Sequence, residues 1–175
     1  KYNAPARRAG EAVMAQDAVN PLIQPRKAWQ YLPGQRRVKL APDIAYDTPN
    51  PGTAGSSTYD DVGIFNGAMD RFDFKLLGKK EMYIPYNTYK LNYEKEPAKY
   101  ITENHINPDY LRWEKHRVWV VEATLKPDKR HIYKTRSFYL DEDSWRAVAA
   151  DQYDMRDGLY RGSFSHGAVN WEMRT

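Results

Sequence analysis

The chain has 175 residues, a formal net charge of +4 and a content of hydrophobic residues of 41%. This length suits one domain of ordinary size. The absence of cysteine excludes disulfides, zinc–thiolate sites and cysteine nucleophiles, and no apolar run reaches the roughly 18 residues of a transmembrane helix.

The hydrophobic residues of the chain are unusually rich in Tyr and Trp and poor in aliphatic residues. Leu, Ile, Val and Phe together make up only 31 of the 175 residues, whereas the chain contains 14 Tyr and 5 Trp. A share of these four residue types below about 20% indicates disorder only when the net charge is also high. Because the net charge is small, the sequence predicts a folded domain whose apolar surface is largely aromatic.

The first third of the chain predicts a small antiparallel sheet. Alternation places Trp29 with Tyr31 on one face of its second strand, and Val38 with Leu40 on one face of its third. The three strand-like segments, bounded by Pro, Gly and Asn, are residues 10–16, 28–32 and 36–41.

A long loop over residues 42–58 leads into a segment with helical spacing. Gly63 and Gly67 would each cost such a helix about 1 kcal/mol relative to Ala, so tertiary contacts would have to hold it. The apolar positions step by 3, 4 and 3 and predict a short lid or plug helix over residues 60–72 with one apolar stripe: Val62, Phe65, Met69 and Phe72.

The rest of the chain predicts strands. Residues 72–77 and 80–86 are two candidates, the second interrupted at Pro85, which cannot donate to a sheet. From residue 117 onward, four strands joined by short turns indicate an antiparallel meander. The predicted fold class is mainly β (α+β): a curved antiparallel sheet or incomplete β-barrel with one or two short helices.

We find no residue pattern that is typical of catalysis or of a metal site. Ser165 precedes His166, but neighbouring strand residues point to opposite faces, and no G-x-S-x-G turn is present. His116 and His131 flank one predicted hairpin and are interpreted as a surface pair. Paired acids such as residues 141–143 lie at predicted turns, where carboxylates have local roles. We therefore predict no catalytic residue, metal or cofactor.

A basic cluster over residues 126–136 is interpreted as a solvated hairpin edge, because an acidic residue interrupts it and the remaining basic residues are dispersed. This argues against a nucleic-acid partner. The remaining feature is an aromatic and aliphatic lining, which could be plain core or the concave wall of a site for an apolar ligand. The lining residues are Trp29, Tyr31, Trp119, Val121, Leu125 and Trp145.

Several segments, in order, resemble one bacterial family. They are AWQYLPGQRRVKLAPDIAYDTPNP, YDDVGIFNGAMDRFDFKLLGKKEMYIPYN, NPDYLRWEKHRVWVVEATLK and SFYLDEDSWRAVAADQYD. The family is domain-of-unknown-function family 1329, often described as outer-membrane lipoprotein-sorting-like. The element formed by Trp29, Tyr31, Leu32, Pro33, Arg37 and Val38 is also similar to a hallmark of the lipoprotein-carrier superfamily, in which an incomplete barrel with a helical lid cradles acyl chains.

The resemblance implies one domain over residues 1–175 that forms the C-terminal part of a longer periplasmic protein. An association of that protein with the outer membrane is compatible with the resemblance. It implies a non-enzymatic carrier for a lipid or other hydrophobic small molecule, working with an exporter of the resistance-nodulation-division type or an outer-membrane protein. Two alternatives stay open: an interaction module that docks such a protein, and a hydrolase of an envelope polymer or hydrophobic ester.

Overall fold

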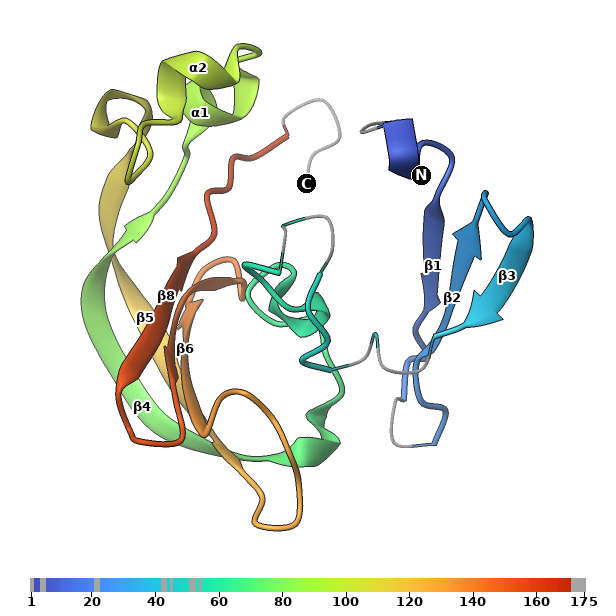
Figure 1. The fold of residues 1–175 in the computed structure, drawn as a ribbon. Helices are drawn as coiled ribbons and strands as arrows, with labels where there is room; N and C mark the ends of the chain where they lie inside the picture. Colours follow the sequence, from blue (N-terminus) through green and yellow to red (C-terminus); the bar gives the residue numbers. More distant parts are fainter. Residues whose placement is uncertain are drawn as a thin grey trace. The chain divides into compact units, whose positions relative to one another are not determined.

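The computed structural model describes residues 2–3, 6–20, 23–41, 44, 46–50, 53 and 55–170. Among them, eight strands form two antiparallel sheets, one of three strands and one of five, and neither sheet closes on itself (Figure 1). This confirms the predicted fold class. None of the described helices is long and apolar enough to cross a membrane.

The contacts divide the chain into two compact units. The first comprises Lys1–Arg71 and Lys129–His131, and the second comprises Phe72–Asp128 and Ile132–Thr175. The single domain expected from the sequence stays a prediction.

The first unit contains the predicted N-terminal sheet. Strand β1 (Ala12–Gln16) pairs with β2 (Lys27–Leu32), and β2 pairs with β3 (Arg37–Leu40), all antiparallel. A short 3₁₀ turn, η1 (Ala6–Arg8), precedes them. The β2–β3 turn closes with Arg36 at a φ of 49°, a left-handed conformation. The sequence therefore predicts this sheet correctly, with strand ends displaced by one or two residues.

The lid helix expected over residues 60–72 is absent, and that prediction is wrong. Only two 3₁₀ turns form there, η4 (Tyr59–Asp61) and η5 (Met69–Arg71). After η4, Val62 is extended, and Gly63 and Ile64 adopt left-handed φ values of 63° and 77°, which end any right-handed helix.

The apolar stripe expected on that helix does not form either. Val62 and Met69 are each 50% exposed, and Phe65 is half-buried. Phe72 is buried, but as the first residue of a strand.

The second unit is built on the five-stranded sheet. Its strands are antiparallel neighbours in chain order, which confirms the predicted meander. They are β4 (Phe72–Pro85), β5 (Trp113–Leu125), β6 (Thr135–Asp141), β7 (Ala147–Tyr153) and β8 (Leu159–Phe164).

Strand β4 is one strand of 14 residues, where the sequence predicts two. The pairing with β5 shifts register between Leu76 and Gly78, and Gly78 has a φ of 118°. Such a β-bulge bends a strand without ending it. The long β4 and β5 accordingly curve along their length (Figure 1).

The connection from β4 to β5 carries the short helices α1 (Tyr89–Tyr93) and α2 (Pro97–Tyr100) and the 3₁₀ turn η6 (Pro108–Tyr110). The Asn107 side chain caps η6 by accepting a hydrogen bond from Asp109 N at 3.0 Å, as its position before a proline predicts.

A small core lies near the end of β4, where Ile84, Val118 and Val148 are buried against the partly buried Met82, Tyr86 and Tyr139. The predicted solvated edge over residues 126–136 is wrong in part. Within it, the Arg136 side chain is fully buried, with its guanidinium 5.0 Å from the centre of the Tyr133 ring.

Candidate functional site

One face of the three-stranded sheet is made of apolar side chains. The register aligns Ala12, Tyr31 and Val38 in one row and Met14, Trp29 and Leu40 in the next. We call these six residues the apolar face. Met14, Val38 and Leu40 are 59%, 64% and 64% exposed. A hollow of about 270 Å³ lies over five of the six residues: Ala12, Met14, Trp29, Tyr31 and Val38.

The opposite face of this sheet is covered in part by the first unit, although Ala15 and Lys39 on it are exposed. Ala28 is buried there, and Gln30 Nε2 donates a hydrogen bond to Glu11 Oε1 at 2.6 Å. Arg8 Nε donates to Glu11 Oε2 at 2.8 Å and lowers the pKa of that carboxyl. The sheet thus has one face with buried and hydrogen-bonded side chains, and one apolar face on which three of the six side chains are exposed.

The other four predicted lining residues belong to the second unit. Trp119, Val121 and Leu125 share a face of β5, and their partners on β4 continue it with Leu76 and Phe72. Leu76 is 58% exposed, whereas Phe72 is buried. The described structure therefore places the six predicted residues in two groups, one in each unit.

The sequence predicts Trp145 on a strand, but in the structure Trp145 lies outside the strands. It follows the β6–β7 turn with a φ of 58°, and β7 begins two residues later. Its ring nevertheless stacks on that of Trp119, with centroids 6.4 Å apart and planes inclined by 22°. Lys79 Nζ lies 4.1 Å from the centre of the Trp119 ring, so this cluster has a charged rim.

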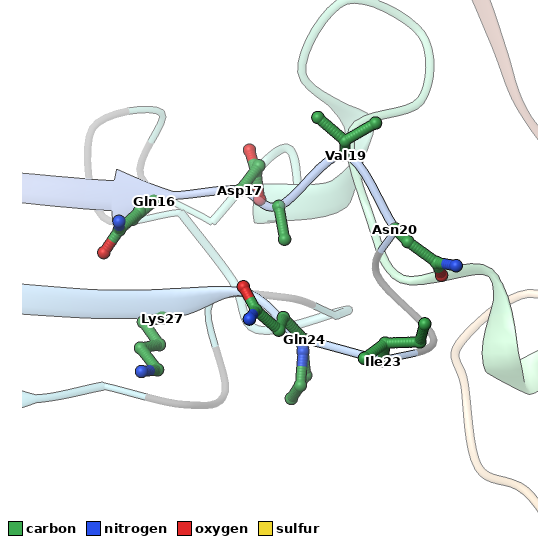
Figure 2. A pocket seen from close by; sticks show the side chains of 9 residues that line it. Gln16, Asp17, Val19, Asn20, Ile23, Gln24 and Lys27 are labelled. Carbon is green, nitrogen blue, oxygen red and sulfur yellow. The ribbon is translucent and has the colours of Figure 1, made fainter.

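The connection between β1 and β2 encloses a second hollow in the first unit, of about 490 Å³ (Figure 2). Ion pairing between Arg26 Nε and Asp17 Oδ1 at 2.5 Å joins the two arms of this connection. Val19 and Ile23 are its most exposed apolar side chains. The hollow is lined by Gln16, Asp17, Ala18, Val19, Asn20, Ile23, Gln24, Pro25 and Lys27.

A cavity of about 240 Å³ with both polar and apolar lining residues lies at one end of the five-stranded sheet. The segment after β8 forms one wall and is fixed by Thr88, whose backbone N and side-chain Oγ1 both donate to Gly167 O at 3.0 Å. The cavity is lined by Pro85, Tyr86, Asn87, Ser144, Arg146, Val148, Ser165, Gly167, Ala168 and Val169.

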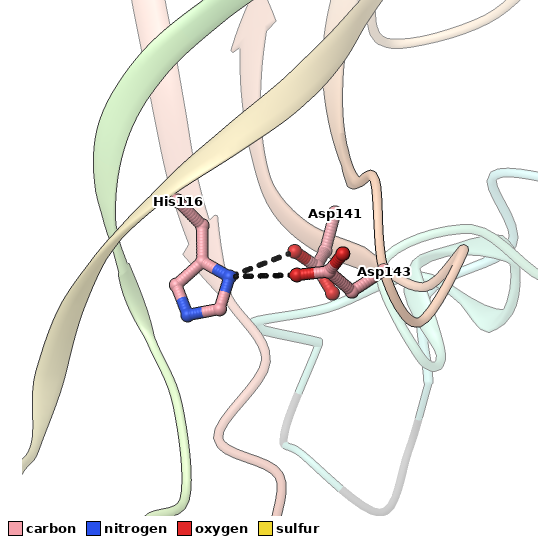
Figure 3. A group of neighbouring side chains, drawn as sticks. All are labelled: His116, Asp141 and Asp143. Atoms are coloured by element: carbon pink, nitrogen blue, oxygen red, sulfur yellow. Dashed lines mark ion pairs between the residues drawn. The ribbon is translucent and has the colours of Figure 1, made fainter.

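Beside this cavity, His116 faces the carboxylates of Asp141, the last residue of β6, and of Asp143 in the turn that follows (Figure 3). His116 Nδ1 lies 3.3 Å from Asp141 Oδ1 and 3.5 Å from Asp143 Oδ2. These three side chains offer ligand atoms that all lie within 4.8 Å of one another. Two lining residues contact the group: Tyr86 stacks on His116, and Ser144 donates to Asp141.

Sequence reasoning missed this group, because it interpreted the acids as turn residues and His116 as a partner for His131. His131 instead lies 2.9 Å from Asp60 in the first unit. The register of β5 and β6 brings His116 and Asp141 together, and this register could not be known from the sequence. It aligns Val118 with Asp141, so His116, two residues from Val118, faces the same side.

A cleft with two acids, or a Ser–His pair, in hydrogen-bond reach would favour the hydrolase alternative. Ser165 Oγ instead accepts a hydrogen bond from Arg146 Nη2 at 3.4 Å, and His166 Nδ1 is buried without a hydrogen-bond partner in the described structure. Burial lowers the pKa of His166. This pair does not form a nucleophile and base.

The chain is similar in sequence to a bacterial protein and in fold to two solved structures. A Pseudomonas aeruginosa protein, "Uncharacterized protein PA3922", is 48% identical over 167 residues, which cover 95% of this chain and 37% of the relative. A crystal structure described as an outer-membrane lipoprotein-sorting protein domain from Vibrio parahaemolyticus is similar with a TM-score of 0.51 at 19% identity, covering 90% of this chain and 50% of that one.

A crystal structure of a DUF1329 family protein from Desulfovibrio piger has a TM-score of 0.53 at 19% identity, covering 93% of this chain and 53% of the other. The chain thus spans between about a third and a half of the length of these relatives. The family described as "Protein of unknown function (DUF1329)" matches residues 1–175. The chain therefore belongs to the DUF1329 family.

Proposed function

We propose that the chain is part of a periplasmic, non-enzymatic carrier that binds a lipid or another hydrophobic small molecule. The observation that carries this proposal is the apolar face. Three of its six side chains, Met14, Val38 and Leu40, are each more than half exposed. Contiguous exposed apolar surface of this kind marks an interaction site in proteins that work in water.

The chemistry of the apolar face suits a hydrocarbon chain. Burying each CH₂ group stabilises a complex by about 0.8 kcal/mol, so a chain of about a dozen carbons offers up to about 10 kcal/mol before the costs of association. Trp29 and Tyr31 add broad rings with a polar edge, which suits a ligand that has both a tail and a polar head.

The fold also supports this proposal. The chain shares its fold with a structure described as an outer-membrane lipoprotein-sorting protein domain, and a related role would place it in the envelope. Partnership with an exporter of the resistance-nodulation-division type, or with an outer-membrane protein, belongs to the same proposal. The absence of Ser165–His166 pairing removes one argument for a hydrolase.

A fluorescence titration with a dansylated fatty acid of about a dozen carbons tests the site. We expect the purified chain to bind the probe and Val38→Glu to weaken binding at least about tenfold, because a carboxylate would then lie against the tail. Lys39→Glu is the matched control, since Lys39 lies on the same strand but on the other face. It should bind as the unchanged chain does.

Two outcomes would contradict the proposal. If the unchanged chain does not bind the probe, the apolar face is not a lipid site, and the alternative of a docking surface for a protein gains support. If Val38→Glu and Lys39→Glu weaken binding equally, the effect is one of charge, and the lipid binds elsewhere.

A further inference from the structure

We infer that His116, Asp141 and Asp143 form a binding site for a divalent transition-metal ion, and that zinc is the ion whose chemistry fits them. The site lies in the second unit and is separate from the proposed lipid site, so either can fail without the other. One imidazole nitrogen and two carboxylates are donors that Zn²⁺ accepts, whereas Mg²⁺ and Ca²⁺ prefer oxygen donors throughout.

The spacing of the donor atoms suits a tetrahedral ion. Zinc binds nitrogen and oxygen at about 2.0–2.1 Å, which places neighbouring ligands of a tetrahedron about 3.3–3.4 Å apart. His116 Nδ1 lies 3.3 Å from Asp141 Oδ1 and 3.5 Å from Asp143 Oδ2, and the ligand atoms of all three side chains lie within 4.8 Å of one another. The two separations from the imidazole nitrogen thus match, to within about 0.2 Å, those between neighbouring ligands of a bound zinc ion.

The buried Asp141 carboxylate is the independent indication of a ligand. The residue is fully buried, and its Oδ2 accepts hydrogen bonds from Ser144 N at 2.8 Å and from Ser144 Oγ at 2.6 Å. Its Oδ1 is also buried but accepts no hydrogen bond in the described structure. A buried carboxylate oxygen without a donor is costly, and this one is the oxygen that faces His116.

Neighbouring residues hold His116 in the orientation that a ligand needs. Its second ring nitrogen, Nε2, lies 3.3 Å from Glu114 Oε2. A carboxylate that receives the far N–H of a metal-binding histidine fixes the tautomer that leaves the other nitrogen free to ligate. The Tyr86 ring stacks on the imidazole, with centroids 4.2 Å apart, and restricts its rotation.

Three protein ligands leave a fourth position open, as in zinc sites that bind water or a substrate. Asp143 is largely exposed, with 75% of its side-chain surface accessible, so an ion can enter from solvent. Tyr86, Ser144 and Arg146 line the adjoining cavity. The cationic Arg146 favours an anionic group, such as a carboxylate or a phosphate, as the fourth ligand.

Calorimetric titration of the untagged chain with ZnCl₂ near neutral pH tests the site. We expect one zinc ion to bind, and Asp143→Asn to weaken binding more than about tenfold. Glu114→Gln should weaken it by about 10-fold to 100-fold, the usual effect of losing an outer-shell carboxylate. Both residues are partly or largely exposed, so circular dichroism should show that both variants stay folded.

Glu142→Gln is the matched control, since it removes the same charge from the same turn. The Glu142 carboxylate pairs with Lys79 and Arg117 and is not one of the three ligands. We expect this variant to bind zinc as the unchanged chain does. The inference is overturned if the unchanged chain binds no zinc, if Asp143→Asn binds normally, or if Glu142→Gln loses affinity equally. Displacement of zinc by equimolar Mg²⁺ or Ca²⁺ would overturn the assignment of the ion.

Discussion

His131 Nε2 lies 2.9 Å from Asp60 Oδ2 in the first unit, and the two side chains are only 1% and 3% exposed. Thr58 Oγ1 donates to the other carboxylate oxygen of Asp60 at 2.5 Å. The pair joins positions 71 residues apart. It therefore ties the 3₁₀ turn η4 to the short segment 129–131 that returns to this unit.

Replacing Asp60 with Ala should lower the free energy of unfolding by about 2–5 kcal/mol, because removing one member of a buried pair leaves polar groups without their counterpart. Urea denaturation measures this change. The control is Asp73→Ala, whose side chain is 74% exposed and should change stability by less than about 0.5 kcal/mol. Equal effects of the two substitutions would show that the Asp60–His131 contact does not stabilise the fold.

Gly78→Ala tests the bulge that keeps β4 continuous. A φ of 118° strains any residue with a Cβ, so we expect a loss of about 1–3 kcal/mol of stability, although open space surrounds the position. Gly162→Ala in β8 is the matched control, since its Cβ would also meet open space but its φ is not in the positive range. If both substitutions are neutral in thermal unfolding, Gly78 is not required for the bend.

His166 should make stability depend on pH. Burial lowers the pKa of His166 below its ordinary value of 6.5, so the unfolded chain takes up the proton first. The stabilising contribution of the neutral ring is fully present above pH 6.5 and is lost as the pH falls through the lowered folded value. We expect the melting temperature to drop less on acidification to about pH 5 in His166→Gln than in the unchanged chain. An identical drop would show that His166 does not contribute.

Patterns that depend on alternation could be predicted from the sequence. Trp29 and Tyr31 alternate along β2, and Val38 and Leu40 along β3, so their shared face follows from the period of two residues once the strands pair. The order of β5 to β8 follows from short turns, which restrict each strand to pairing with the next.

Features that depend on tertiary contacts could not be predicted. The helical spacing from Val62 to Phe72 exists in the sequence, but the left-handed Gly63 and Ile64 break it, and Phe72 pairs in a sheet instead. The burial of His131 and Arg136 reverses what a basic cluster indicates, since charged residues are rarely buried without partners. The meeting of His116 with Asp141 requires the register of β5 and β6 to be known.

The apolar face should tolerate polar substitution without loss of stability. Met14 and Val38 are largely exposed, so Met14→Glu and Val38→Glu should each change the free energy of unfolding by less than about 1 kcal/mol. Chemical denaturation checks this, with Ala28→Glu at a buried position of the opposite face as the contrast. Strong destabilisation by Met14→Glu or Val38→Glu would show that the apolar face is core and not a binding surface.

Native mass spectrometry of the chain purified from a Gram-negative host tests the central claim of lipid binding most directly. The proposal predicts a mass adduct that corresponds to a lipid or another hydrophobic molecule, that can be extracted into organic solvent, and that Val38→Glu reduces while Lys39→Glu does not. Spectra of the unchanged chain that show no adduct, together with no uptake of added lipid, would contradict the proposal.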